Sequence, residues 1–293
     1  MSLSVQEAHP LLAARVRGVH IRQGITPADA AAIEQLIARY PVLIFPDQRI
    51  DDDQQMAFSR HFGPLQVAVS YATRPGEHRL AAAITDVSNI GKDAQTFQAG
   101  DRRRMNNLGS RRWHTDSSYL PVSARYSLLS AHSVPPVGGE TQFADMRAAY
   151  DALPDHLRDL VETLEAEHDV IYSRSVVGFT DVEPNERAAL PPTHKKLVRV
   201  HPLSGRKSLY LSSHASHIVG WPVPEGRDLL HELTELATQP GFVYTHVWSL
   251  HDLVMWDNRC TMHRGRRHLP ETHPRDMHRT TVEDRALPAA QRA

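Results

Sequence analysis

Hydrophobic residues in the first sixty positions predict a helix, a strand and a second helix, in that order. Thr26 and Pro27 form a typical N-cap and first-turn pair, and apolar side chains then recur at helical spacing up to Tyr40. The next segment, PVLIFP at 41–46, is continuously apolar and predicts a buried strand. The stretch DDDQQMAFSRHFG begins with acidic residues and ends at Gly63, which predicts the second helix.

The second half of the chain carries mostly β patterns. Two helices are predicted there, beginning at Pro154 and Pro224. Their apolar faces share helical spacing and comprise Leu157, Leu160, Val161, Leu164, Leu229, Leu233 and Leu236. LVRVHP and KSLYLS predict a hairpin around the turn SGR, and further strands are predicted for FVYTHVW, HDLVMWDN and MHRTTV.

This order of elements indicates a mainly β fold with flanking helices. The strands are short, their connections are long, and neither a repeat nor a GxGxxG motif is present, so alternating βαβ units are not favoured. We expect a jelly roll, that is a double-stranded β-helix, in one domain over residues 1–293. Residues 64–112 are polar and rich in glycine and arginine, with one strand-like stretch at 84–87, and are expected to form a mobile cover.

Composition excludes several classes of function. The formal net charge is -1, from 33 basic and 34 acidic residues, which gives no electrostatic reason to expect nucleic acid as a partner. No apolar run approaches the ~20 residues that span a bilayer, and the first residues lack the pattern of a signal peptide, so we expect a cytoplasmic protein. Cys260 is the only cysteine, so a metal site must use nitrogen and oxygen ligands.

His114 and Asp116 are the first candidate metal ligands. The pair alone is weak evidence in a chain with nineteen histidines, and a polar turn is the plain alternative. On a strand, however, residues two apart project from the same face. His263, at the end of the strand pattern DLVMWDNRCTMHRG, is the best third ligand. Two imidazoles and one carboxylate are the ligand set of non-haem iron(II) oxygenases, although zinc remains an alternative.

A dicarboxylate site is predicted beside these ligands. Arg275, Met277 and Arg279 share one face of the last strand, and two inward cations are costly unless they meet anions. A dicarboxylate that chelates iron at one end and meets Arg275 at the other satisfies this requirement. Thr141, after the turn at 138–140, is expected to bond the same carboxylate. The alternative places both arginines at the rim, in surface ion pairs.

Four segments together resemble a known family. WHTDSSY, PPVGGETQFADMRAAYDALP, LVMWDNRCTMHRGRR and PRDMHRTT are similar to the iron(II)- and 2-oxoglutarate-dependent taurine/2,4-dichlorophenoxyacetate dioxygenases, and most similar to the α-type 2,4-dichlorophenoxyacetate dioxygenases. The resemblance implies Fe(II), 2-oxoglutarate and O2, with residues 64–112 holding an active-site lid. It implies His114, Asp116 and His263 as iron ligands. The implied 2-oxoglutarate site is Thr141, Trp248 and Arg275.

The same resemblance implies the substrate. Arg279 matches a position near the substrate or near the chelating end of 2-oxoglutarate, and His201, His214 and His217 match histidines expected beside the substrate. We therefore expect a small carboxylate, a phenoxyacetate such as 2,4-dichlorophenoxyacetate, to be hydroxylated next to its ether oxygen. The products would be a phenol and glyoxylate, with succinate and CO2, as in aromatic compound degradation.

Two alternatives to this function remain at this point. The first is the same chemistry on a sulfonate such as taurine or on another small acid. The second is a non-catalytic jelly-roll protein that binds a metal or an acid. No nucleic acid or membrane partner is expected. We expect the chain to form a homo-oligomer.

Overall fold

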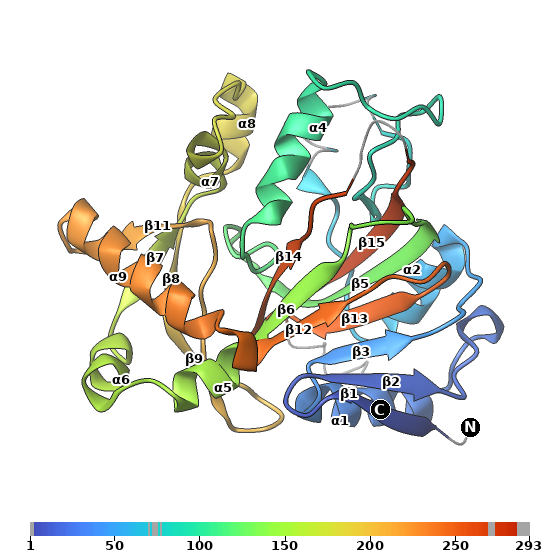
Figure 1. The fold of residues 1–293 in the computed structure, drawn as a ribbon, viewed down its shortest axis with the longest axis horizontal. Coiled ribbons are helices and arrows are strands. Elements are labelled where there is room, and N and C mark those ends of the chain that lie inside the picture. Colours follow the sequence, from blue (N-terminus) through green and yellow to red (C-terminus); the bar gives the residue numbers. More distant parts are fainter. Residues whose placement is uncertain (1–2, 70, 72–75, 77, 269–272, 286–293) are drawn as a thin grey trace.

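The strands form two main sheets that face one another (Figure 1). The computed structural model describes residues 3–69, 71, 76, 78–268 and 273–285. The larger sheet has the order β1 (Ser4–His9), β2 (Ala13–Arg17), β3 (Val42–Phe45), β13 (Leu253–Asp257), β5 (Ala124–Ser133), β15 (Asp276–Glu283) and β4 (Thr85–Asp86). The smaller has the order β12 (Val243–His246), β6 (Thr141–Asp145) and β14 (Thr261–Gly265).

Alternation along the central strands divides the core into two layers. On β13, Leu253 and Met255 pack in the layer under the helices, while Val254 and Trp256 pack between the sheets with Phe143 of β6. All five side chains are at most 1% exposed. Each contributes about 1.5–3 kcal/mol by burial, so the period of two in the sequence specifies both layers. The predicted jelly roll is the fold that the chain adopts.

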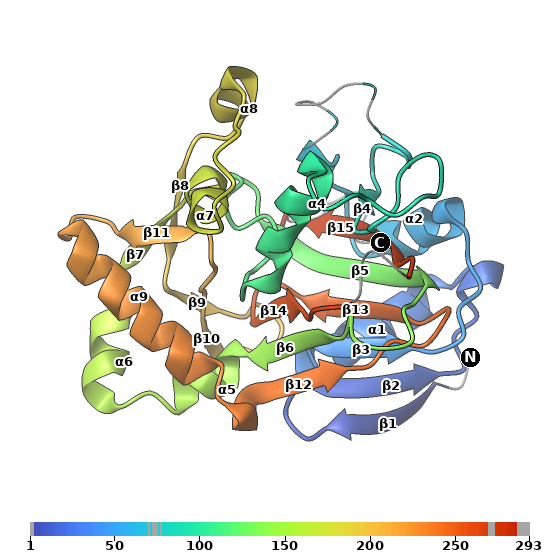
Figure 2. The ribbon, with the colours of Figure 1, turned by 45° about the horizontal axis from the view of Figure 1, so that its top comes forward.

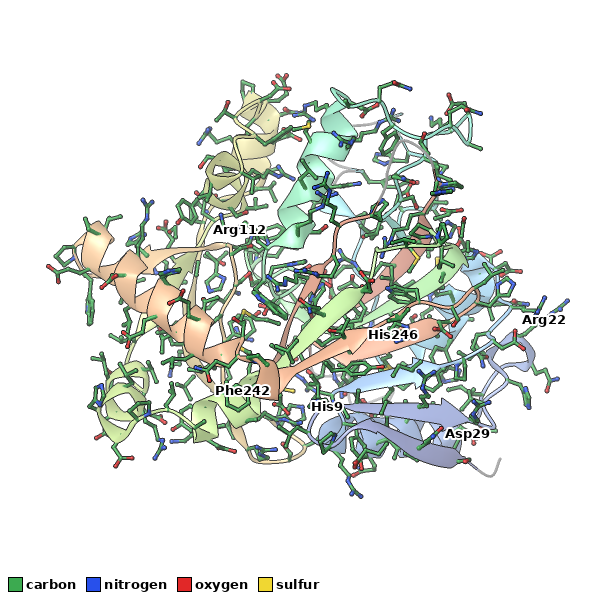
Figure 3. All side chains as sticks on the ribbon, in the orientation of Figure 1. His9, Arg22, Asp29, Arg112, Phe242 and His246 are labelled. Atoms are coloured by element: carbon green, nitrogen blue, oxygen red, sulfur yellow. The ribbon has the colours of Figure 1, made fainter. Side chains whose placement is uncertain are left out.

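Two helices cover the outer face of the larger sheet. They are α1 (Pro27–Arg39) and α2 (Asp52–Arg60), where the sequence predicted them. Thr26 caps α1, because its hydroxyl oxygen accepts a hydrogen bond from the backbone N–H of Asp29, at 3.2 Å, and the Asp29 carboxylate accepts one from the Thr26 N–H. Figure 3 labels Asp29. A cap of this kind stabilises a helix by about 1 kcal/mol.

A helical lobe flanks the smaller sheet (Figure 2). It contains α5 (Met146–Asp151), α6 (Asp155–Val161), α7 (Val170–Val176), α8 (Pro184–Ala189), α9 (Val223–Ala237) and η3 (Pro240–Phe242). Its strands are β7 (Glu165–His168), β8 (Thr193–Lys196), β11 (Ala215–Ile218) and the predicted hairpin of β9 (Val198–Val200) and β10 (Lys207–Leu209). The helix predicted from Pro154 ends at Val161, before Leu164, the last apolar residue of the predicted pattern. The backbone N–H of Leu164 donates to the Val161 carbonyl and closes a turn after the helix.

Residues 64–112 contain little regular structure. Within their described part lie β4, which pairs with β15, and the short helices α4 (Arg102–Asn107) and η2 (Leu108–Arg111). The strand-like stretch at 84–87 is thus a two-residue strand at the sheet edge. Residues 70, 72–75 and 77 of the expected lid lie outside the described residues. A further short helix, η1 (Ile21–Gln23), precedes α1, and no helix in the described chain is long and apolar enough to cross a membrane.

Candidate active site

A single β-bridge joins the two histidines predicted as metal ligands. The N–H of His114 donates to the carbonyl of His263 at 2.9 Å, and the N–H of His263 donates back at 2.8 Å. The expected strand at 114–116 is wrong, because pairing stops at His114 and Asp116 begins a turn. Thr115 points the other way, with its hydroxyl donating to the Leu211 carbonyl at 2.8 Å. The side chains of His114 and Asp116, on either side of Thr115, therefore still face the same cavity.

The three predicted ligands converge at one point. One ligand atom from each of His114, Asp116 and His263 lies within 4.8 Å of the other two, and the three side chains are buried. Nε2 of His114 is 3.8 Å from Oδ1 of Asp116, and Nε2 of His263 is 3.7 Å from Oδ2. Nδ1–H of His114 donates to the Arg112 carbonyl at 2.8 Å, which leaves Nε2 free for a metal.

The charge states at this point suit a divalent cation. Burial lowers the pKa of His114 and drives that of His263 well below its usual value, so both rings are neutral at pH 7. Although burial opposes ionisation, the Arg279 guanidinium, together with the hydrogen bond from the Ser127 hydroxyl, holds the pKa of Asp116 below its usual range. Two neutral imidazoles and one carboxylate match the donor set of octahedral iron(II) sites with open positions.

A cavity of about 110 Å³ adjoins the ligands and reaches Arg275 and Thr141. Arg275 is 8% exposed and has no carboxylate partner among the described residues. Its guanidinium donates to the Val87 carbonyl at 3.1 Å, and burial lowers its pKa to about 10. A buried cation without a counter-ion favours an anionic ligand. Arg275 therefore does not lie at the rim in a surface ion pair, which was the alternative interpretation of the sequence.

The turn before Thr141 allows Arg275 to lie there. Gly139 has φ +79°, and a Cβ atom at this position would lie 3.4 Å from Nε of Arg275 and 3.1 Å from Pro135. Glycine is thus favoured by the left-handed backbone conformation, and a Cβ atom would in addition crowd Pro135. Trp248 does not line the 110 Å³ cavity. Its indole N–H instead donates to Oγ1 of Thr141 at 3.0 Å, so it orients that hydroxyl.

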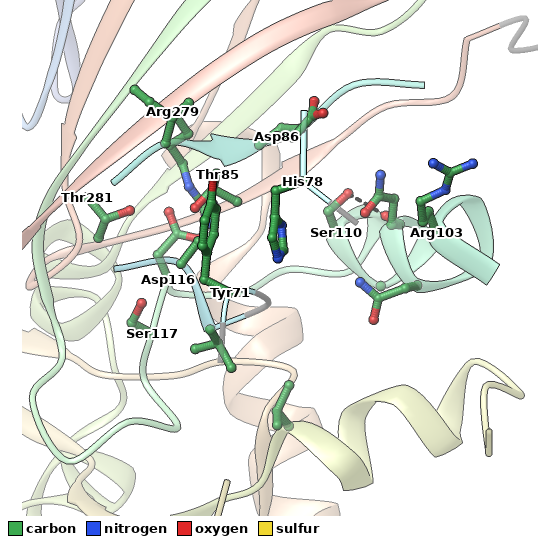
Figure 4. Close-up of a pocket in the computed structure, with 18 of the residues that line it drawn as sticks. Tyr71, His78, Thr85, Asp86, Arg103, Ser110, Asp116, Ser117, Arg279 and Thr281 are labelled. Atoms are coloured by element: carbon green, nitrogen blue, oxygen red, sulfur yellow. Dashed lines mark hydrogen bonds and ion pairs between the residues drawn. The ribbon is translucent and has the colours of Figure 1, made fainter. Parts of the chain in front are cut away.

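A second cavity, of about 290 Å³, opens on the other side of the ligands (Figure 4). Arg279 lies against Asp116 there, with its Nη1 donating to Oδ1 at 2.5 Å, and Tyr71 stacks on His78 across the space. His214 also lines this cavity, and burial drives its pKa well below the usual value, so its ring is neutral. The cavity therefore offers one cation and one neutral imidazole close to the metal ligands.

Two histidines predicted at the substrate lie elsewhere. His201 is 2% exposed, and its Nε2 lies 2.9 Å from Asp257 in a buried cluster that includes Arg259. His217 lies on β11, where its Nδ1 bonds the Ser216 hydroxyl at 2.9 Å. Neither lines the cavities beside the metal ligands. Both expectations are corrected, because the chain after β9 holds His201 against Asp257 of β13, and β11 holds His217 outside both cavities.

Some cavity residues had little signal in the sequence. Arg174 of α7 lines the larger cavity and forms no ion pair within the described chain. Ser110 and Asn107 line both cavities, and the Ser110 hydroxyl donates to the Asn107 carbonyl at 2.7 Å. His246 is buried on β12, with its Nε2 3.1 Å from Asp252, and lines neither cavity (Figure 3). Only the fold brings α7 and the end of α4 beside the metal ligands.

Comparison with known proteins defines the class. The family model described as "Taurine catabolism dioxygenase TauD, TfdA family" matches residues 4–281. The chain therefore belongs to the TauD/TfdA dioxygenase family, which confirms the predicted family and enzyme class.

Individual relatives cover nearly the whole chain. The alpha-ketoglutarate-dependent 2,4-dichlorophenoxyacetate dioxygenase of Cupriavidus pinatubonensis is 46% identical over 98% of this chain and 100% of its own length. The (S)-phenoxypropionate/alpha-ketoglutarate-dioxygenase of Sphingobium herbicidovorans is 41% identical over 77% of this chain and 76% of its own. The crystal structure of AAD-2 with Mn(II) and N-oxalylglycine is 48% identical, covers 97% of this chain and 98% of its own, and has a TM-score of 0.93. A double-stranded β-helix is thus confirmed.

Proposed function

We propose that the protein is an Fe(II)- and 2-oxoglutarate-dependent dioxygenase that cleaves phenoxyacetates. The observation that carries this proposal is the adjacency of three converging ligands and the buried Arg275 guanidinium, which has no carboxylate partner in the described part of the chain. A metal-binding module without catalysis has no need for Arg275 in the 110 Å³ cavity beside the ligands. Relatives named for alpha-ketoglutarate and 2,4-dichlorophenoxyacetate, 46% and 44% identical to this chain, support the same conclusion.

His114, Asp116 and His263 would hold Fe(II), with three coordination positions left for the cosubstrate and O2. Bound iron supplies the activation of O2, coupled to conversion of 2-oxoglutarate to succinate and CO2. Arg275 binds the far carboxylate of 2-oxoglutarate through a charge-assisted pair. Because Oγ1 of Thr141 already accepts the Trp248 N–H, its own proton is free to donate to that carboxylate.

Arg279 would bind the carboxylate of the substrate in the larger cavity, which His214 also lines. The Ser173 hydroxyl lies 2.8 Å from the Val170 carbonyl, which can only accept its single proton, so Nδ1–H of His214 donates to Ser173 at 2.7 Å and Nε2 is left as an acceptor. Anchoring the carboxylate beside Asp116 presents the adjacent CH2 to the metal site. Hydroxylation of this carbon gives a hemiacetal, which breaks at the ether oxygen into phenol and glyoxylate. No protein nucleophile is needed.

Further expectations remain predictions. We propose that residues 1–293 act as one dioxygenase domain, with the described part of 64–112 forming a cover over the substrate. In support, Arg79, Ile84 and Phe97 from this segment line the larger cavity. A cytoplasmic location and a homo-oligomeric state are likewise predictions from the sequence.

The test of the proposed function has two steps. Anaerobic protein with Fe(II) and 2-oxoglutarate is expected to develop a visible charge-transfer band, and its absence from folded, iron-loaded protein would refute the cosubstrate. Succinate formation is then measured with phenoxyacetates, phenoxypropionates and taurine, with each organic product identified. We expect phenol and glyoxylate from 2,4-dichlorophenoxyacetate. Faster turnover of taurine than of every phenoxy acid would refute the substrate class.

A further inference from the structure

The carboxylate of Asp116 is held by protein donors on both oxygens. Arg279 donates to Oδ1, and the hydroxyl of Ser127, on β5, lies 2.7 Å from Oδ2. The backbone N–H of Asp116 donates to Oδ1 of Asn258 at 3.2 Å. Asn258 and Ser127 are fully buried, and Asp116 is 3% exposed. Water is thus not available as the partner of these groups, and their bonds to one another fix the carboxylate.

The orientation of the Asn258 amide is settled by its neighbours. One end of this amide faces the backbone N–H of Asp116 and, at 3.1 Å, the indole N–H of Trp256. Both of these groups are donors only, so the atom between them must be the amide oxygen. The NH2 end therefore points the other way, where it lies 2.9 Å from Oγ of Ser127.

This orientation gives the hydrogen bonds one direction. Since Asn258 Nδ2 donates to Ser127 Oγ, the single Ser127 proton is left for Oδ2 of Asp116. A hydrogen bond from a neutral hydroxyl to a carboxylate is charge-assisted and is strengthened in a water-free site. The three groups come from β5, the 114–116 segment and the residue after β13, so the network ties the segment that carries Asp116 to two strands of the larger sheet.

We infer that Ser127 and Asn258 are positioning residues that hold the Asp116 carboxylate in its metal-binding orientation, with Asn258 acting partly through the Ser127 hydroxyl. The role of the metal rests on the proposed function. Without the Ser127 proton, Oδ2 loses a fixed donor and the carboxylate is free to turn about its Cβ–Cγ bond. Groups that orient a metal ligand typically contribute 10–100-fold to metal affinity.

The test measures Mn(II) binding to the full-length apoprotein, without 2-oxoglutarate or substrate, from the electron paramagnetic resonance signal of free Mn(II). Ser127→Ala is expected to raise the Mn(II) dissociation constant roughly 10–100-fold. The matched control is Ser130→Ala, which also removes a buried, hydrogen-bonded serine from β5, one that donates to Gln55 at 2.6 Å. This control is expected to leave Mn(II) affinity unchanged.

Asn258→Ala provides the second variant. It is expected to weaken Mn(II) binding. The double variant with Ser127→Ala is expected to lose less Mn(II) binding free energy than the two single variants lose in sum, because one residue acts through the other. If Ser127→Ala does not fold, Ser127→Cys replaces it, since a thiol is a weak donor of similar shape.

Urea unfolding of each apoprotein separates positioning from general packing. A lower unfolding midpoint with unchanged Mn(II) affinity would overturn the inference, as would equal losses of affinity in the Ser127 and Ser130 variants. Because no turnover is measured, weakened Mn(II) binding would uphold it even if phenoxyacetate cleavage were not found.

Discussion

Replacing Arg275 by methionine is expected to stabilise the apoprotein while weakening 2-oxoglutarate binding. Burial lowers its pKa to about 10, a fall that corresponds to roughly 3 kcal/mol. Because the folded-state pKa of this base lies below its unfolded value, the full cost is present at neutral pH and fades only above about pH 10. Methionine removes that cost and loses one hydrogen bond to Val87, worth about 1 kcal/mol.

The net gain in unfolding free energy is therefore about 1–2 kcal/mol, or roughly 2–4 °C in Tm for a chain of this size. In turnover, the lost charge-assisted contact is expected to cost about 2 kcal/mol or more, which raises KM for 2-oxoglutarate roughly 30-fold or more. Thermal unfolding of the apoprotein and steady-state succinate formation measure the two effects on the same preparation.

Arg266→Met is the matched control, because Arg266 lines the same cavity but is exposed to solvent. Its loss is expected to change KM for 2-oxoglutarate far less, since water screens an exposed charge. An unchanged KM in the Arg275 variant would refute the carboxylate contact. A fall in apoprotein Tm of several degrees would refute the reasoning about buried charge.

Two other substitutions test one residue pair on each of the two main sheets. Hydrogen bonds to Asp276 and Asp52 raise the pKa of His278 to about 9 even though burial opposes its charge, so its stabilisation is full below about pH 6.5 and is lost as pH rises through 9. Urea unfolding should show His278→Gln less stable than wild type by about 3 kcal/mol at pH 6, with the gap closing by pH 10; a gap independent of pH would contradict this. Trp248→Phe removes the donor to Thr141 and should raise KM for 2-oxoglutarate about fivefold without lowering kcat. In a protein that already carries Thr141→Val, Trp248→Phe should leave KM for 2-oxoglutarate unchanged.

The sequence by itself determined the local elements and the chemistry of the site. Capping residues and helical spacing located α1 and α2, and the period of two on β13 located both layers of the core. These features depend on neighbours in sequence, so local physical chemistry is sufficient to predict them. The candidate ligands and Arg275 were likewise recognisable, because few residue types bind a metal or a carboxylate.

Only the tertiary structure decided which polar groups meet. His114 faces the cavity through a bridge to His263 rather than through a strand of its own, and Asn258 bonds a residue 142 positions away. His201 resembled a substrate ligand in sequence but is bonded to Asp257 inside the protein. The physical reason is that a buried polar side chain must find a partner wherever the packed chain supplies one. Sequence spacing does not contain that information, since the partners are set by pairing between distant strands.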